Sequence, residues 1–233
     1  MNKNEFINAL KDLNITLTDK MLDDLDTYYK MLIEYNSHTN LTRITEENEV
    51  YLKHFYDSLT LVKAIELDNQ TLLDIGTGAG FPGLVLKIVS PNLKVTLVDS
   101  LNKRITFLKS VIEKLNLKDI EAVHARAEEY ILDKRESFDI VTSRAVANMS
   151  ALSELCIPFV KVGGYFIPMK ADAKAELELA KTAVKTLGGV IKDTIVFELP
   201  SGAGTRNIIK IEKLSKTSVK YPRKFNEIKK KPL

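Results

Sequence analysis

The spacing of hydrophobic and polar residues divides the chain into a helical N-terminal part and a longer part in which strands alternate with helices. Over residues 5–65, apolar residues recur at the spacing of amphipathic helices. The predicted apolar face of the first long helix, with Thr18 as its N-cap, consists of Leu22, Leu25, Tyr29, Leu32 and Ile33. The polar stretch 36–42 separates this helix from a second one, which begins after Thr45 with three acidic residues suited to the positive end of the helix dipole.

From residue 71 onward, short apolar runs alternate with helix-length amphipathic segments, a pattern typical of an α/β fold with a parallel sheet. The predicted strands are Thr71–Asp74, Lys94–Asp99, Ile120–His124, Phe138–Ser143, Gly164–Met169, Val190–Leu199 and Asn207–Lys213. The predicted helices between them are Pro82–Val89, Lys103–Leu115, Ser150–Val160 and Ala173–Thr186. Only the turn-rich segment 200–204 separates the last two strands, so we expect them to pair antiparallel.

These patterns predict three parts: a helical extension at residues 1–65, an α/β core at 66–214 and a C-terminal tail at 215–233. The chain has 233 residues, 45% hydrophobic and 28% charged, which excludes disordered and fibrous classes. Its single cysteine, Cys156, has no partner for an internal disulfide, and the first residues lack the apolar run of a signal peptide. We therefore expect a cytoplasmic protein that does not enter membranes.

Positive charge is concentrated at the C-terminal end. The net charge of the whole chain is +3, but residues 210–233 hold nine Lys or Arg residues against two acids. This asymmetry suggests a polyanionic partner such as nucleic acid. A lysine-rich end that is merely solvated is an equally weighted alternative.

A glycine-rich turn follows the first predicted strand, in the sequence LLDIGTGAGFPG at residues 72–83. In an open α/β sheet this turn lies at the carboxyl edge, where ligands bind, and glycine lets the backbone approach them closely. Gly78, Gly80 and Gly83 also satisfy the dinucleotide pattern GxGxxG, which alone is a weak signal. Asp74 at the strand end and Pro82, which removes a backbone donor, disfavour a pyrophosphate and favour the positively charged S-adenosylmethionine.

Three later strand ends carry further candidate residues for the same site. Asp99 ends the second strand, where an acid can accept hydrogen bonds from both ribose hydroxyls. The segment 124–128, His-Ala-Arg-Ala-Glu, follows the third strand and suits an adenine wall. Ser143-Arg144-Ala145 follows the fourth. The alternative for Asp99 is a helix cap, and for the glycine run an ordinary turn.

The chemistry of the methyl acceptor follows from what these strand ends contain. Enzymes that methylate exocyclic amines usually carry an Asn/Asp-Pro-Pro-aromatic run after the fourth strand, and this sequence has none there. Carbon-5 methylation of pyrimidines needs a thiolate, but Cys156 lies in an apolar helical segment typical of a core. A ring nitrogen is the better acceptor. The three histidines show no metal-ligand spacing, so no metal is expected.

Together these segments resemble the bacterial small-subunit ribosomal RNA guanine-N7 methyltransferases, also called glucose-inhibited division protein B. The resemblance rests on Asn40-Leu41-Thr42, the KHFYDS segment at 53–58, DIGTGAGFPG at 74–83, VDSLNKR at 98–104, Arg126-Ala127-Glu128, Ser143-Arg144-Ala145, Tyr221-Pro222-Arg223-Lys224 and Lys231-Pro232-Leu233. It covers nearly the full chain. The chain departs from the family at residues 225–228, Phe-Asn-Glu-Ile, where a glycine is usual.

The resemblance implies a class I, Rossmann-like methyltransferase core with a seven-stranded, mostly parallel sheet and an N-terminal helical extension. It implies a bacterial enzyme that uses S-adenosylmethionine to methylate N7 of a guanine in the decoding-region hairpin of 16S ribosomal RNA. The cofactor contacts that it implies are Gly76, Phe81, Ala127, Glu128 and Arg144. The general logic of class I sites adds Asp74, Gly78, Gly80 and Asp99.

Neutral guanine N7 has a lone pair and no hydrogen, so its methylation requires alignment rather than a general base. We expect Arg144 to orient the base or a phosphate. The cations expected along the RNA path are Lys53, Lys103, Arg104, Lys170, Arg206, Arg223 and Lys224, although solvation is the commoner role of any single surface cation. We favour a docking role for His54, and we expect a monomer. The other classes left open are a methyltransferase acting on a small molecule or another RNA, a nicotinamide oxidoreductase, and a cofactor-binding regulator without catalysis.

Overall fold

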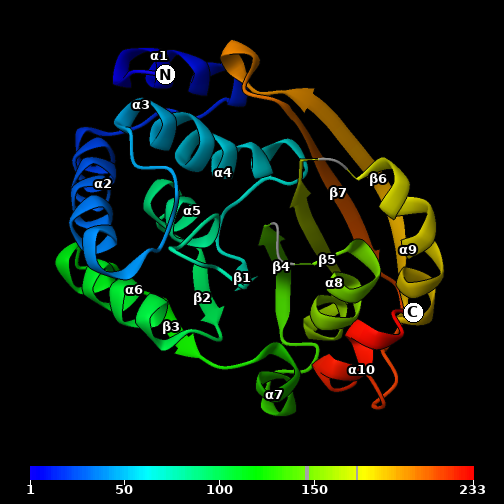
Figure 1. The fold of residues 1–233 in the computed structure, drawn as a ribbon. Coiled ribbons are helices and arrows are strands. Elements are labelled where there is room, and N and C mark those ends of the chain that lie inside the picture. Colours follow the sequence, from blue (N-terminus) through cyan, green and yellow to red (C-terminus); the bar gives the residue numbers. More distant parts are fainter. Residues whose placement is uncertain (145–146, 172) are drawn as a thin grey trace.

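A seven-stranded mixed sheet forms the centre of the molecule (Figure 1). The computed structural model describes residues 1–144, 147–171 and 173–233. Its strands are β1 (Thr71–Ile75), β2 (Lys94–Asp99), β3 (Ile120–His124), β4 (Phe138–Arg144), β5 (Val160–Lys170), β6 (Gly189–Glu198) and β7 (Thr205–Lys213). Their order across the sheet is β3-β2-β1-β4-β5-β7-β6, and β7 runs antiparallel to both β5 and β6. The predicted sheet, with its antiparallel last pair, is confirmed.

Helices cover both faces of this sheet, as its apolar strands require. One face carries α1 (Lys3–Leu10), α2 (Asp19–Thr39), α3 (Glu47–Val50), α4 (Asp57–Leu59), α5 (Gly83–Val89) and α6 (Asn102–Lys114). The other carries α7 (Ala127–Tyr130), α8 (Met149–Cys156), α9 (Lys174–Thr186) and α10 (Phe225–Lys230). A π-helical turn, Tyr51–Tyr56, joins α3 to α4. Short 3-10 turns lie at Lys11–Leu13, Thr60–Lys63, Ile131–Asp133, Ile157–Phe159 and Pro200–Gly202.

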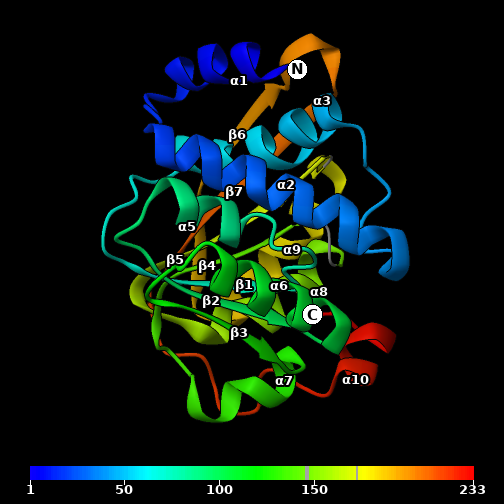
Figure 2. The ribbon, with the colours of Figure 1, turned by 90° about the vertical axis from the view of Figure 1, so that its left-hand side faces the viewer.

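Neighbouring residues of the central strands contribute to different apolar clusters, because successive side chains of a strand point to opposite faces. Leu72 of β1 and Ile140 of β4 pack with the N-terminal helices, whereas Leu73 and Val141 pack with α8 and α9. The long helix α2 lies across α5 and α6 (Figure 2). The N-terminal helices thus share a core with one face of the sheet.

Two segments differ from the sequence expectations. The helix predicted over Ser150–Val160 ends at Cys156 and continues only as a 3-10 turn, since Pro158 lacks the N–H that an α-helix needs. The C-terminal tail forms α10, whose Ile228 is fully buried against the cluster around α8. The division at residues 65 and 214 stays a prediction.

Candidate cofactor and substrate site

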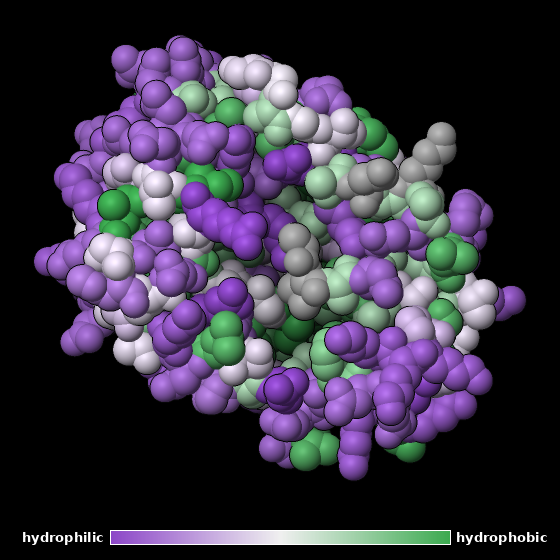
Figure 3. Space-filling model, in the orientation of Figure 1, coloured by the Kyte–Doolittle hydropathy of each residue, from purple (hydrophilic) through white to green (hydrophobic). Residues whose placement is uncertain are grey.

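A cavity of about 500 Å³ opens at the carboxyl ends of β1 to β4. This volume is typical of sites for small molecules. Its lining comprises Leu41, Thr42, His54, Ile75, Gly76, Thr77, Gly78, Ala79, Phe81, Val98, Asp99, Ser100, Arg104, Ala125, Arg126, Ala127, Glu128, Arg144, Leu155 and Phe225. Figure 3 shows the face of Figure 1 hollowed near its centre, where hydrophilic and apolar surfaces meet.

The glycine turn after β1 forms one wall of this cavity. Gly76 and Gly78 both have positive φ, at 69° and 63°, which glycine adopts without strain. The N–H groups of Gly76 and Thr77 donate to the carbonyl of Val98 at the end of β2, which fixes the turn against the neighbouring strand. A Cβ on Gly78 would meet no atom within 4 Å and would project into open space. The turn is therefore a cradle with room for a ligand beside Gly78.

Asp74 lies behind the turn and does not line the cavity. Its Oδ2 accepts hydrogen bonds from the Thr77 hydroxyl at 2.7 Å and the Gly83 N–H at 2.9 Å, so the carboxyl group braces the turn at both ends. Burial is complete and raises the pKa of Asp74 to about 6. The structure gives Asp74 a bracing position rather than the expected contact at the cavity wall.

Gly80 also lies outside the lining, and its small size has a packing cause. A Cβ there would come within 2.7 Å of the Tyr28 hydroxyl oxygen. Tyr28, fully buried on α2, donates a hydrogen bond from that hydroxyl to the carbonyl of Ala79. The N-terminal helices therefore hold the cofactor turn directly. Sequence reasoning placed Tyr29 on the buried face instead, although the residues buried are Leu25, Tyr28 and Leu32.

Asp99, at the end of β2, does line the cavity. Its carboxylate accepts hydrogen bonds from the N–H groups of Gly78 at 3.0 Å and Leu101 at 2.9 Å, and from Nη1 of Arg104 at 3.0 Å. These contacts orient an acid that is almost fully buried, and they join the first and second strand ends.

The wall beyond β3 combines apolar and charged residues. Ala125 and Ala127 lie there with Arg126 and Glu128, and Leu155 of α8 also lines the cavity. Such a surface suits an aromatic ring with polar edges. Phe225, at the first position of α10, completes the wall. Sequence reasoning missed Phe225, because a single aromatic residue in a lysine-rich segment gives no periodic signal.

Arg144, at the end of β4, is held by three groups of the N-terminal part. Its Nη1 donates to the carbonyl of Lys53 at 3.1 Å and to Oδ2 of Asp57 at 3.2 Å, and its Nη2 lies 3.2 Å from Nδ1 of His54. Its guanidinium carbon lies 5.1 Å from the centre of the Phe81 ring. Ala145, the next residue of the motif, lies outside the described residues. Arg144 is thus fixed in orientation at the cavity wall.

His54 reaches both the core and the cavity. Its ring stacks on Phe81 with centroids 4.2 Å apart, and its Nε2 lies 2.9 Å from the Thr42 hydroxyl oxygen. Burial and the neighbouring Arg144 cation lower the pKa of His54 to about 3. Nδ1 of the ring lies 3.2 Å from both Nη2 of Arg144 and the carbonyl oxygen of Lys53. His54 thus joins the N-terminal part to Phe81 of the glycine turn and also lines the cavity, and its docking role stays a prediction.

Asp57, on the same helical segment, connects two arginines that sequence reasoning treated separately. Its two oxygens bind Arg144 and Nε of Arg206, the latter at 3.0 Å. The carboxylate is 4% exposed, so one buried negative charge faces two cations. Sequence reasoning missed Asp57, although it lies within the KHFYDS segment.

Most cations expected along the RNA path have partners within the protein. Five are paired with acids: Lys53 with Glu49, Arg104 with Asp99, Lys170 with Glu176, Arg206 with Asp57 and Arg223 with Glu154. Lys103 donates from Nζ to the carbonyl of Thr39. Lys224 is exposed at the start of α10. Among the residues that the structure describes, the arginines that line the cavity are Arg104, Arg126 and Arg144.

Two further properties concern metals and membranes. Within the residues that the structure describes, His, Cys, Asp and Glu side chains form no group of three or more able to hold a metal ion. None of the helices over those residues combines the length and the apolar character that crossing a membrane requires.

Solved structures share this fold. A SAM-dependent methyltransferase from Aquifex aeolicus superposes with a TM-score of 0.55 at 17% identity, covering 74% of this chain and 97% of that chain. TYW2 from M. jannaschii, solved in complex with AdoMet, gives a TM-score of 0.58 at 15% identity, covering 74% of this chain and 80% of that chain. At these identities the likeness shows the fold. The sheet order, with β7 antiparallel between β5 and β6, and the glycine turn after β1 define the class I methyltransferase fold.

Sequence comparisons identify the family. The profile of GidB, rRNA small subunit methyltransferase G, matches residues 21–208. Proteins named ribosomal RNA small subunit methyltransferase G are 52% identical in Limosilactobacillus reuteri, over 100% of both chains, and 54% identical in Staphylococcus saprophyticus, over 94% of this chain and 93% of that one. The chain belongs to the rRNA small subunit methyltransferase G family. The resemblance inferred from its motifs is confirmed.

Proposed function

We propose that this protein transfers the methyl group of S-adenosylmethionine to N7 of a guanine in 16S ribosomal RNA. The observation that carries the proposal is the 52% identity, over the full length of both chains, to a ribosomal RNA small subunit methyltransferase G. A cavity with cofactor-sized volume and an arginine held at its wall supports the same reaction.

The reaction requires little acid or base chemistry from the protein. S-adenosylmethionine supplies an electrophilic methyl group on a sulfonium, and neutral guanine N7 already has the lone pair that attacks it. The protein aligns nitrogen, carbon and sulfur and excludes water, and such orientation can lower a barrier by about 7 to 11 kcal/mol. Asp74, buried behind the turn, need not act as a base.

In this account the cofactor is held by residues at the ends of three strands, β1 to β3: Gly76, Gly78, Phe81, Asp99, Ala127 and Glu128. Asp99 accepts hydrogen bonds from the ribose hydroxyls, and the adenine packs against the wall that includes Ala127 and Leu155. Asp74 and Gly80 shape the turn from behind and do not touch the cofactor.

Arg144 is the residue that orients the target base. Its guanidinium is held by Asp57, the Lys53 carbonyl and His54, so its remaining N–H groups have a fixed direction at the cavity wall. Planar donors of this kind suit the acceptor oxygen at the edge of guanine. Its action is positioning, since no proton is transferred.

The RNA path uses exposed positive charge, with Lys103 and Lys224 as its freest members and the paired cations as weaker contributors. The protein acts as a monomer in the cytoplasm on the small-subunit RNA, free or assembled.

An acceptor-atom test separates N7 methylation from other reactions. Two transcripts of the small-subunit RNA are compared, one ordinary and one with 7-deazaguanosine, which has a carbon in place of N7. With labelled S-adenosylmethionine, we expect label in the ordinary transcript, or in small subunits from a strain lacking the enzyme, and none in the deaza transcript. The deaza transcript must still compete for binding.

Label in the deaza transcript would contradict the N7 acceptor. Label in no RNA or subunit, while S-adenosylhomocysteine still binds, would indicate a small-molecule acceptor.

A further inference from the structure

The C-terminal segment 221–233 returns to the cofactor cavity. Its helix α10 packs against α8, and Figure 1 shows α10 beside α7 and α8. Ile228 is fully buried in the apolar cluster on this face, and Phe225, one turn earlier, lines the cavity. Part of the cavity wall therefore comes from a segment that follows the last strand.

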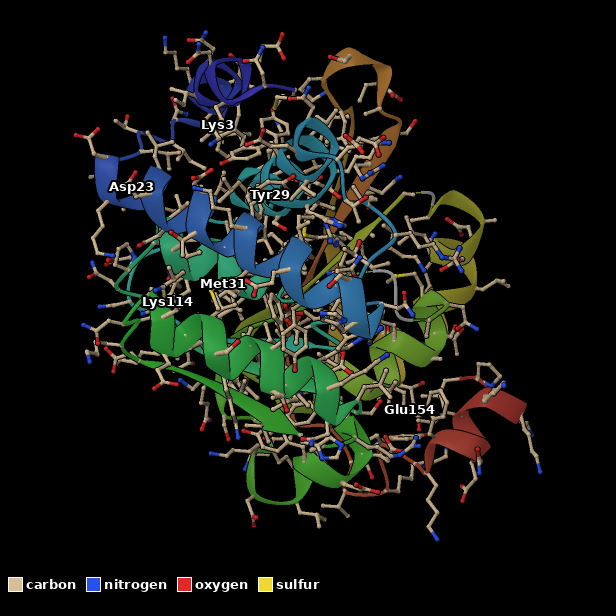
Figure 4. The ribbon with its side chains drawn as sticks, turned by 60° about the vertical axis from the view of Figure 1, so that its left-hand side comes forward. Lys3, Asp23, Tyr29, Met31, Lys114 and Glu154 are labelled. Atoms are coloured by element: carbon tan, nitrogen blue, oxygen red, sulfur yellow. The ribbon has the colours of Figure 1, made fainter. Side chains whose placement is uncertain are left out.

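One buried ion pair holds this segment in place. Glu154 of α8 is completely buried, and it accepts three hydrogen bonds from Arg223: from the main-chain N–H at 2.9 Å, from Nε at 2.8 Å and from Nη2 at 2.6 Å. The same Nη2 donates to the carbonyl of Lys231 at 3.0 Å and so ties the two ends of α10 together. Figure 4 labels Glu154, on α8 beside the C-terminal helix.

This geometry gives Arg223 a structural role besides its positive charge. A forked arginine on a carboxylate is among the strongest polar contacts, and a buried acid left without its partner is costly. Arg223 lies two residues before Phe225, so the pair fixes the place where the aromatic ring enters the wall. The Arg223–Glu154 pair thereby attaches the basic C-terminal segment to α8, which net charge alone does not reveal.

The neighbours of Phe225 indicate which end of the cavity it serves. It is partly buried against the apolar cluster that includes Ala127 and Leu155, two residues that also line the cavity. Phe81, by contrast, belongs to the cluster on the other face of the sheet, with the N-terminal helices. Phe225 therefore lies on the side of the cavity that α8 and the Ala127–Leu155 cluster form, across the sheet from the cluster that holds Phe81.

We propose that Phe225 is a cofactor-binding residue whose ring packs on the adenine of S-adenosylmethionine, and that Arg223 positions it through Glu154. An aromatic face stacks on any base, and the surrounding wall offers the apolar surface that an adenine ring needs. The inference rests on the cofactor and not on the RNA acceptor. It can therefore fail while the proposed reaction stands.

The absence of tryptophan from the sequence allows a direct test. In a Phe225→Trp variant, the indole is the only one in the protein, and stacking on adenine quenches its fluorescence. We expect saturable quenching by S-adenosylhomocysteine and by adenosine. The matched control is Val219→Trp, at an exposed position of the same terminal region, which should not respond. Unchanged emission at a concentration that calorimetry shows to be saturating would overturn the proposal.

Calorimetry without RNA supplies the second readout. We expect Phe225→Ala to weaken binding of S-adenosylhomocysteine and of adenosine by the same factor, about 5-fold to 100-fold. Phe225→Leu keeps apolar volume without a ring, so it should fold as the wild type does and still lose several-fold. Wild-type affinity in Phe225→Leu would overturn the stacking contact. No binding of S-adenosylhomocysteine by the wild type would instead contradict the cofactor assignment.

The positioning role of Arg223 is tested by a double-variant cycle. Arg223→Lys keeps a cation beside Glu154 but loses the forked contact. We expect this substitution to weaken adenosine binding when Phe225 is present. In the Phe225→Ala background it should have little further effect, because the ring that Arg223 positions is then absent. Equal effects in both backgrounds would make Arg223 a purely structural residue.

Discussion

Asp57 joins Arg144, which lines the cavity, to Arg206 through the two oxygens of one buried carboxylate. It binds Arg144 with one oxygen and Arg206 with the other, at distances of 3.2 and 3.0 Å. Two cations on one acid leave a net positive charge at this place, which suits an acceptor nucleotide whose phosphate is negative. A single carboxylate in the N-terminal part thus sets the orientation of the arginine at the end of β4.

The first residue-scale prediction concerns Arg144→Lys. An ammonium group is one point of charge and cannot satisfy Asp57, the Lys53 carbonyl and His54 together as a guanidinium does. We expect kcat/KM for RNA to fall about 100-fold, equivalent to about 2.7 kcal/mol, while a cation still accompanies Asp57 and Tm falls by only a few degrees. Steady-state kinetics and thermal melts measure both. Comparable losses of activity and stability would show that Arg144 only supports the fold.

Burial of His54 predicts a pH-dependent stability, because its folded-state pKa of about 3 lies below its ordinary value of 6.5. Between these values the unfolded chain binds a proton that the folded protein does not, so stability is complete above pH 6.5 and falls as pH drops toward 3. The slope reaches about 1.4 kcal/mol per pH unit. His54→Gln should show a shallower loss than the wild type in denaturant titrations over that window. Identical slopes for the two proteins would refute the buried neutral state.

At the scale of the element, helix α2 supports the glycine turn. The Tyr28 hydroxyl donates to the Ala79 carbonyl, while its ring stacks with Phe55 at 5.5 Å and packs with Phe107. A substitution that removes only the hydroxyl leaves this aromatic packing in place. The cofactor turn is therefore coupled to the extension by one identifiable hydrogen bond.

We expect Tyr28→Phe to lower the free energy of unfolding by about 1 to 3 kcal/mol, because a buried carbonyl loses its partner. Binding of S-adenosylhomocysteine should weaken several-fold as the turn loses its support. The matched control is Tyr29→Phe, whose hydroxyl donates to the Thr45 carbonyl on the surface and whose side chain Figure 4 labels. Denaturant melts and calorimetry give the two readouts. Equal behaviour of the two variants would contradict the coupling.

The helix α10 has an exposed side rich in lysine, distinct from its buried Ile228. Replacing Lys224, Lys229, Lys230 and Lys231 with Gln leaves the Arg223–Glu154 pair intact. If these lysines contact RNA phosphates, the slope of log affinity against log salt should fall in magnitude by about 3. A control variant removes four other exposed lysines, Lys94, Lys109, Lys114 and Lys118. An unchanged slope in the α10 variant would remove this helix from the RNA path.

The sequence alone was sufficient to predict most elements of the sheet, because apolar runs such as 94–99 are bounded by clear turns. The sequence also predicted the glycine turn, since the strand, the acid and the glycines fall in one short segment. It did not predict that Tyr28, Asp57 and Phe225 take part in the site. Each lies outside the predicted α/β core at 66–214, and only the folded chain brings such distant segments together.

At the scale of the whole molecule, three parts of the chain build one site. The N-terminal extension supplies His54 and the support of Arg144, the sheet supplies the cradle and Asp99, and the C-terminal segment supplies Phe225. The two apolar clusters on opposite faces of the sheet meet at this cavity through Phe81 and Leu155. Contacts far apart in sequence thus determine the geometry of a transfer that needs alignment above all.

The central claim is that this site methylates guanine N7 in the small-subunit RNA. It is tested most directly by incubating the protein with labelled S-adenosylmethionine and 16S ribosomal RNA, free and in small subunits, from a strain lacking the enzyme. The RNA is then digested and the labelled nucleoside identified. The account predicts 7-methylguanosine as the labelled product, and label in any other nucleoside would contradict it.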